Sequence, residues 1–184
     1  MANIRKPYGT SSEGNLINVG TVATPATGTI TVKESGNGIV QRTELTLTAV
    51  SLIVPVGAAN LASGKLIYTL PAGAILTNCE YISVAITGTG STNSADTPVL
   101  GLGTTIGTGA VAVLSGTAGF VNMMAGQAVA DSNGTAKVKT VSTSLVVEAA
   151  DAHIVHLNIA GAWTGADAGM LATGTVVIHW TLIK

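Results

Sequence analysis

The closing stretch of the chain, Thr173-Gly-Thr-Val-Val-Ile-His-Trp-Thr-Leu-Ile183, decides the fold. Four of its large apolar side chains fall on every second residue: Val176, Ile178, Trp180 and Leu182. A period of two places these side chains on one face of a β-strand, because successive residues of a strand point to opposite sides. The stretch therefore predicts a strand that buries Trp180 in a core and carries His179 on its outer face.

The longest of the other strand-like segments, Thr43–Val54, contains an irregularity. Leu45 and Leu47 share one face, but the apolar set changes phase at Ala49–Val50. Such a slip indicates either a β-bulge or a strand that passes from one sheet to another. Pro55 follows, and it either ends the strand or places it at the edge of a sheet.

Further segments with alternating apolar residues are separated by turn residues such as Asn, Gly and Pro. We expect strands at Thr29–Lys33, Lys65–Leu70, Ile75–Ile86, Thr97–Leu102, Ala110–Leu114, Thr135–Val147 and His153–Ala160. Helix is expected only as short turns within Ser115–Ala130. About eight or nine strands at irregular spacing predict an all-β domain, built as an antiparallel β-sandwich or as a barrel.

The composition supports this class and argues against several others. Charged residues make up 9% of the chain, against about 25% in an average soluble domain. Glu, Lys and Arg are therefore too few to cover long solvent-facing helices. The eight Lys and Arg residues are scattered and the net charge is −1, so we expect no nucleic-acid partner. Polar residues and Pro55 interrupt the longest apolar stretch, Ala49–Ala62, so no membrane-spanning helix is expected.

The chain divides into an arm and one domain. Residues 1–24 show no sustained period, which predicts an extended N-terminal arm, and residues 25–184 are expected to form a single β-sandwich domain. The arm either frays in solution or becomes ordered on a neighbouring chain. The side chains of the arm that suit a protein contact are Arg5, Lys6, Pro7 and Tyr8.

The sole cysteine, Cys79, cannot form a disulfide within the chain. A secreted domain of this type often carries paired cysteines, so the single thiol favours synthesis in a reducing cytosol. Cys79 alternates with Thr77 and Tyr81, which predicts a half-buried, unreactive thiol.

Motifs associated with ligand binding are present only in incomplete form. Gly101-Leu-Gly103-Thr-Thr-Ile-Gly107 looks like a dinucleotide-binding loop, but no amphipathic helix follows it to hold a pyrophosphate. His153 and His156 would point to opposite faces of a strand, because they are three residues apart. Asp151 lies close by, but no cysteine or carboxylate pair completes a zinc site. We therefore expect no cofactor and no metal.

The remaining candidates have simpler structural explanations. Glu148 and Asp151 are the nearest approach to an acid–base pair, and they flank a turn. Asp131-Ser-Asn-Gly134 matches only part of a calcium loop, and a tight hairpin explains it. Trp163 and Trp180 could offer a carbohydrate platform, although a tryptophan in an alternating strand more often lies in the core. Without a complete site, the sequence predicts that the chain is not an enzyme.

The Thr-, Gly-, Ala- and Val-rich strands and the closing Thr173–Ile183 segment resemble small virion structural proteins of tailed bacteriophages. The segment Lys65-Leu-Ile-Tyr-Thr-Leu-Pro-Ala-Gly73 is similar to a "lysine, aromatic, Pro-x-Gly" stretch of such chains. The resemblance extends in style from Thr43 to Lys184. It implies a jelly-roll-like antiparallel β-sandwich, a major capsid protein as partner, a homotrimer or homodimer, and no catalytic residues.

The function expected from this resemblance is that of a virion structural protein. It would be a capsid decoration or cement protein, made in the host cytoplasm and bound to the outside of the phage head. There it would stabilise contacts between major capsid protein subunits, since low charge density suits the close packing of many copies.

The alternative is a receptor- or glycan-binding β-sandwich module of a phage tail or spike, or of a bacterial surface protein. That alternative predicts aromatic and acidic side chains in the loops. The loops Gly88–Thr97 and Gly103–Gly109 hold small and hydroxyl-bearing residues with one Ile and one Asp.

Overall fold

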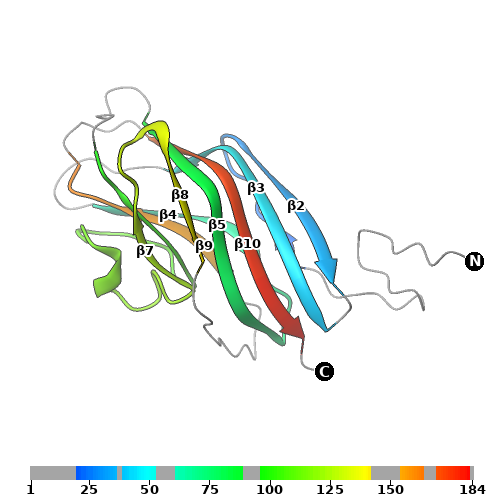
Figure 1. The fold of residues 1–184 in the computed structure, drawn as a ribbon. Helices are drawn as coiled ribbons and strands as arrows, with labels where there is room; N and C mark the ends of the chain where they lie inside the picture. Colours follow the sequence, from blue (N-terminus) through cyan, green and yellow to red (C-terminus); the bar gives the residue numbers. More distant parts are fainter. Residues whose placement is uncertain are drawn as a thin grey trace, which may run out of the picture.

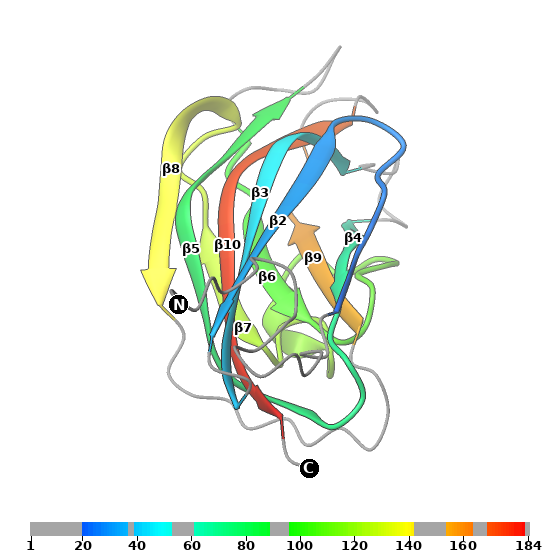
Figure 2. The same ribbon diagram turned by 90° about the vertical axis from the view of Figure 1, so that its right-hand side faces the viewer.

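The computed structural model describes residues 20–36, 39–52, 61–88, 96–141, 154–163 and 169–182. These residues form ten strands in two five-stranded antiparallel sheets that pack face to face (Figures 1 and 2). The prediction of an all-β sandwich is confirmed. The front sheet, which faces the viewer in Figure 1, has the order β2 (Thr29–Gly36), β3 (Val40–Leu52), β10 (Met170–Leu182), β5 (Ala74–Gly88) and β8 (Asn133–Val141). The back sheet has the order β1 (Thr21–Val22), β4 (Ala62–Thr69), β9 (Ile154–Ala160), β6 (Val99–Gly103) and β7 (Met124–Ala128).

The strand order is that of a jelly roll. From β3 to β10 the chain resembles one long hairpin, in which β6 pairs with β7, β5 with β8, β4 with β9 and β3 with β10. Successive pairs of this hairpin lie alternately in the back and front sheets, so the ribbon is rolled up into the sandwich. Eight strands connected in this way form the double-sheet jelly roll found in viral capsid, lectin and cupin domains. β1 and β2 extend the two sheets at β4 and β3.

The core between the sheets follows the alternation of β3 and β10. Val176, Ile178 and Trp180 of β10 are fully buried, as the period of two predicts, and Val176 pairs with Leu45 of β3. Tyr81 of β5 lies on the other side of Val176 and is also buried. Burial of such side chains is the main favourable term in folding, at roughly 25 cal/mol per Å² of apolar surface.

The phase slip in β3 is a β-bulge, and the strand stays in one sheet. Val50 pairs with Ala172 and Leu47 pairs with Gly174, so β3 has one more residue than β10 between these two pairs. The extra residue lets Ala49 adopt a φ of 49°, in the left-handed region. Leu47 and Val50 are therefore both buried although they are three residues apart.

Three predictions about elements need correction. Ala110–Leu114 forms no strand, because it belongs to the loop between β6 and β7, and the helical turn η1 (Leu114–Gly116) follows it. A bulge between Leu66 and Tyr68 breaks the alternation expected in Lys65–Leu70. β1 at Thr21–Val22 lies within the predicted arm, so the sandwich begins before residue 24. No helix in the described part of the chain is long and apolar enough to cross a membrane.

Candidate functional site

The predicted contact residues of the arm lie outside the described residues: Arg5, Lys6, Pro7 and Tyr8. The described chain begins at Gly20, and the next two residues, Thr21 and Val22, pair with Thr69 and Tyr68 at the edge of the back sheet. The described chain therefore begins beside the end of β4.

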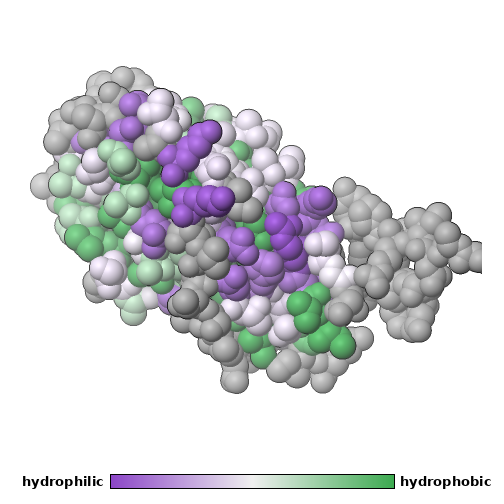
Figure 3. All heavy atoms as spheres, in the orientation of Figure 1, coloured by the Kyte–Doolittle hydropathy of each residue, from purple (hydrophilic) through white to green (hydrophobic). Residues whose placement is uncertain are grey.

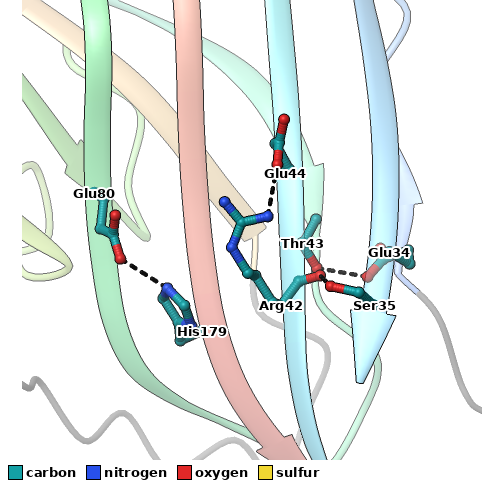
Figure 4. A network of polar contacts seen from close by, with 7 residues as sticks. All are labelled: Glu34, Ser35, Arg42, Thr43, Glu44, Glu80 and His179. Carbon is teal, nitrogen blue, oxygen red and sulfur yellow. Dashed lines mark hydrogen bonds and ion pairs between the residues drawn. The ribbon is translucent and has the colours of Figure 1, made fainter. Parts of the chain in front are cut away.

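Polar and charged side chains gather on the outer face of the front sheet (Figure 3). Arg42 donates to Glu44 with an Nη1–Oε2 distance of 2.6 Å, and Nε2 of His179 lies 2.8 Å from Oε1 of Glu80 (Figure 4). Val177 pairs with Glu44 on one side and Glu80 on the other, and it is fully buried on this outer face. Long charged side chains can cover apolar surface in this way. Two side-chain pairs, Arg42–Glu44 and His179–Glu80, therefore lie on this face, and an exposed ion pair such as Arg42–Glu44 adds about 0–1 kcal/mol of stability.

A second polar network joins the two sheets at one edge of the sandwich. Glu34 of β2 accepts hydrogen bonds from the hydroxyl groups of Thr43 (2.8 Å) and Tyr68. The indole N–H of Trp180 donates to Oγ1 of Thr43 at 2.9 Å, and the backbone N–H of Gly20 donates to the Tyr68 hydroxyl at 2.8 Å. Burial and the neighbouring Glu34 carboxylate raise the pKa of Tyr68 above its ordinary value, so the phenol keeps its proton and donates. The network binds β2 to β4 and has a structural role.

The loop between β6 and β7 covers the outer face of the back sheet. Its residues Leu114 and Phe120 are buried with Ala62 of β4 and Ala160 of β9 in a second, smaller core. The sandwich therefore has three layers at this place: the front sheet, the back sheet and the loop.

Asn158 of β9 fixes this loop to the back sheet. Its side chain is fully buried and has three partners in the loop. Oδ1 accepts the N–H of Gly107 at 2.7 Å, and Nδ2 donates to the carbonyl groups of Thr105 (2.9 Å) and Phe120 (2.8 Å). An amide side chain can satisfy both donors and acceptors of a loop backbone at once.

The glycines of the segment Gly101–Gly107 allow the loop to pack closely against the back sheet. A Cβ atom on Gly103 of β6 would lie 2.0 Å from the carbonyl oxygen of Gly119 in the loop, and one on Gly101 would lie 2.3 Å from the Val121 side chain. Glycine is needed here because the loop backbone lies directly on the sheet.

A groove of about 560 Å³ lies along the edge of β4. Its floor is Ala62–Leu66, one wall is formed by the segment after β1 around Ala23 and Thr24, and the other wall is the loop segment Ile106–Gly109. Small side chains and backbone make up most of this lining, and Lys65 is the only charged residue among the described residues that form it. Nothing in the sequence indicated this groove.

The metal and turn candidates have the following outcomes. His156 lies half-buried on β9, and burial lowers its pKa, while His153, Glu148 and Asp151 lie outside the described residues. Within the described ranges, no group of three or more His, Cys, Asp and Glu side chains could hold a metal ion. The Asp131 carboxylate accepts the N–H of Asn133 at 3.1 Å, as in a turn, but the expected tight hairpin is wrong, because β7 and β8 lie in different sheets and this segment crosses between them.

The two tryptophans do not form an exposed platform. Trp180 is fully buried in the main core. Trp163 is half-buried against the same core, and its indole N–H donates to the carbonyl oxygen of Leu61 at 3.0 Å.

Cys79 is fully buried, whereas the sequence predicted a half-buried thiol. Burial, with a smaller contribution from Glu80, raises the pKa of Cys79 to about 12. We expect the native thiol to react with a disulfide reagent such as DTNB at pH 8 at least about 100-fold more slowly than the urea-unfolded chain, because thiolate is the reacting species and an unperturbed thiol has a pKa of about 8.5. Stopped-flow absorbance measures both rates. Similar rates in the two states would contradict the buried position.

No protein-family model matches the chain, and none of the curated proteins matches it in sequence. Among solved structures, the chain is similar to one in the capsid asymmetric unit of the cyanophage Pam1, with a TM-score of 0.41 and 18% sequence identity. The match covers 89% of this chain and 94% of that chain. A TM-score of 0.41 does not by itself establish a shared fold, and the strand order of this chain is what identifies the jelly roll.

Proposed function

We propose that the chain is a virion structural protein of a tailed phage, with the role of a capsid decoration or cement protein. It would bind the outside of the head and stabilise contacts between major capsid protein subunits. The observation that carries the proposal is the strand order, in which β3-β10-β5-β8 packs against β4-β9-β6-β7. This jelly roll recurs in viral capsid domains, and the sequence resemblance to small phage virion proteins supports the same role.

The placement of aromatic and reactive side chains favours this role over glycan binding or catalysis. Of the described aromatic residues, only Trp163 is not buried, and the others lie in the two cores: Tyr68, Tyr81, Phe120 and Trp180. A ligand pocket is usually lined by aromatic side chains with a few convergent polar groups. Here the aromatic side chains mainly stabilise the sandwich and are not gathered at an exposed site. Broad, individually weak contacts repeated over a lattice suit such a surface.

Binding to phage heads that lack this protein tests the proposal. We expect the purified chain to co-sediment with such heads, to saturate at a fixed number of copies per head, and to raise the temperature at which the heads release DNA. Light scattering of the chain alone gives the size of the bound unit.

Two matched double variants test whether the arm makes the contact. Arg5→Ala with Lys6→Ala removes the arm charges, and Lys137→Ala with Lys139→Ala removes two charges from β8. We expect only the arm variant to bind heads more weakly. If the wild-type chain does not bind phage heads but binds immobilised glycans, the proposal is contradicted and the receptor-binding alternative is supported.

A further inference from the structure

The groove along β4 lies on an open edge of the back sheet. β1 pairs only with Tyr68 and Thr69 of β4, so among the described residues no strand pairs with the rest of this edge. The open stretch is bounded at both ends by backbone hydrogen bonds. The N–H of Ala62 donates to the carbonyl oxygen of Gly109 at 3.1 Å, and the carbonyl oxygen of Ile67 accepts the N–H of Ala23 at 3.2 Å. Ser63–Leu66 lies between them and forms the floor of the groove.

An edge strand in a groove is suited to an extended peptide. Its backbone presents unpaired N–H and C=O groups to any segment that can align beside it. The walls consist mainly of Ala, Gly, Thr and Ser, so a narrow segment can approach the backbone closely. At about 3.3 Å per residue, an added strand of four to five residues would match the open stretch.

We propose that residues 1–19 of a second copy of this chain supply that strand. Each copy would then be joined to the next by an arm that pairs with the neighbour's β4. The inference concerns the purified chain alone and does not depend on the proposed role at the phage head.

The direction of β1 argues for a second copy. β1 runs antiparallel to β4, with Thr21 opposite Thr69 and Val22 opposite Tyr68. At its N-terminal end β1 therefore points past Thr69, away from Ser63–Leu66, and the copy's own arm would have to reverse direction to reach its groove. Nineteen extended residues can span up to about 60 Å, which is enough to reach a neighbouring domain.

The chemistry of the arm fits the groove. Gly9–Asn15 consists of small and polar residues, with Glu13 as its only charged residue and the only acidic residue in residues 1–19. Lys65 is the only charged residue among the described residues of the groove lining. An ion pair between Glu13 of one copy and Lys65 of the next would fix the position of the added strand.

Site-specific crosslinking in the full-length chain tests this inference. A photoreactive p-benzoylphenylalanine replaces Thr108, an exposed residue in the groove wall, and a matched control replaces Thr46, an exposed residue on the outer face of the front sheet. The modified chain is mixed with unmodified ¹⁵N-labelled chain, irradiated and analysed by mass spectrometry. We expect position 108, and not position 46, to crosslink to ¹⁵N-labelled peptides from residues 1–19.

Other crosslinking results would overturn the inference. Crosslinks from position 108 to unlabelled arm peptides alone would show that the groove holds the copy's own arm. Crosslinks that contain no arm peptide would show that residues 1–19 do not occupy the groove.

Charge reversal gives a second, independent measurement. Lys65→Glu and Glu13→Lys should each weaken self-association about tenfold, and the double variant should recover most of it. Sedimentation equilibrium over a range of concentrations measures the association constant, and circular dichroism checks that each variant folds. Folded single variants that associate like wild type, or a double variant without recovery, would contradict the Glu13–Lys65 pairing. A wild-type chain that self-associates but does not bind heads would instead count against the proposed function alone.

Discussion

Replacement of Trp180 by alanine should lower the free energy of unfolding by about 3–5 kcal/mol, a large part of the 5–15 kcal/mol that stabilises a typical domain. Trp180 lies on β10, the central strand of the front sheet, between β3 and β5. Its side chain is fully buried, and its indole N–H donates to Oγ1 of Thr43. The change would leave a large cavity between the sheets, because close-packed cores relax only partly.

Two further variants separate packing from hydrogen bonding. Trp180→Phe keeps an aromatic ring but removes the N–H, so we expect it to cost less than Trp180→Ala. Trp163→Ala removes the half-buried tryptophan and should also cost less, because Trp163 lies at the margin of the core. Urea unfolding followed by far-UV circular dichroism measures all three changes. If Trp180→Ala lowers the free energy of unfolding by less than about 1 kcal/mol, Trp180 lies outside the core and is again a candidate for a ligand platform.

The strands with a clean period of two could be predicted from the sequence. In β10 and β9 the core-facing residues recur at every second position, and Val155, Leu157, Ile159 and Val176 are buried as expected. The irregularity in β3 could be predicted as well, because the phase of the apolar residues itself changes at the bulge. In each case the pattern is a direct consequence of which face of the strand contacts the core.

Other irregularities of the strands and loops could not be predicted from the order of apolar and polar residues. Ser83 of β5 has a φ of 53°, and the register of β5 against β8 shifts between Tyr81 and Val84, so Tyr81 and Val84 are both buried although they are three residues apart. Ala110–Leu114 has the apolar composition of a strand, but it covers the outer face of the back sheet as a loop. Burial under a third layer and burial between two sheets select the same residue types, so composition does not distinguish them.

The groove could not be predicted because it depends on topology. Among the described residues, the edge at Ser63–Leu66 is open because β4 is next to last in its sheet and β1 is two residues long. Asn158 did carry a signal. It stands between Leu157 and Ile159, on the face away from the core, and it is fully buried. A lone amide within an apolar strand indicates backbone partners beyond the sheet, since buried polar groups are hydrogen-bonded.

Replacement of Asn158 by alanine should release the loop between β6 and β7 from the back sheet. The change leaves three loop groups without their partner, the N–H of Gly107 and the carbonyl groups of Thr105 and Phe120. An unsatisfied buried group costs about 1–3 kcal/mol, so the loss of three partners is comparable to the roughly 1.5–3 kcal/mol gained by burying each of the loop side chains Leu114 and Phe120. Detachment returns these groups to water, so we expect it to become the most populated local opening of the variant.

Hydrogen exchange distinguishes this local effect from a general loss of stability. In Asn158→Ala we expect amide protons of residues 104–123 to lose protection while those of β3 and β10 keep theirs. Asn122→Ala is the matched control, because Asn122 bonds only to Thr104 within the loop and should cost about 1 kcal/mol. Equal loss of protection in loop and core would show that Asn158 supports the whole sandwich. Because Ile106–Gly109 forms one wall of the β4 groove, release of the loop should also weaken self-association, whereas Asn122→Ala should leave it unchanged.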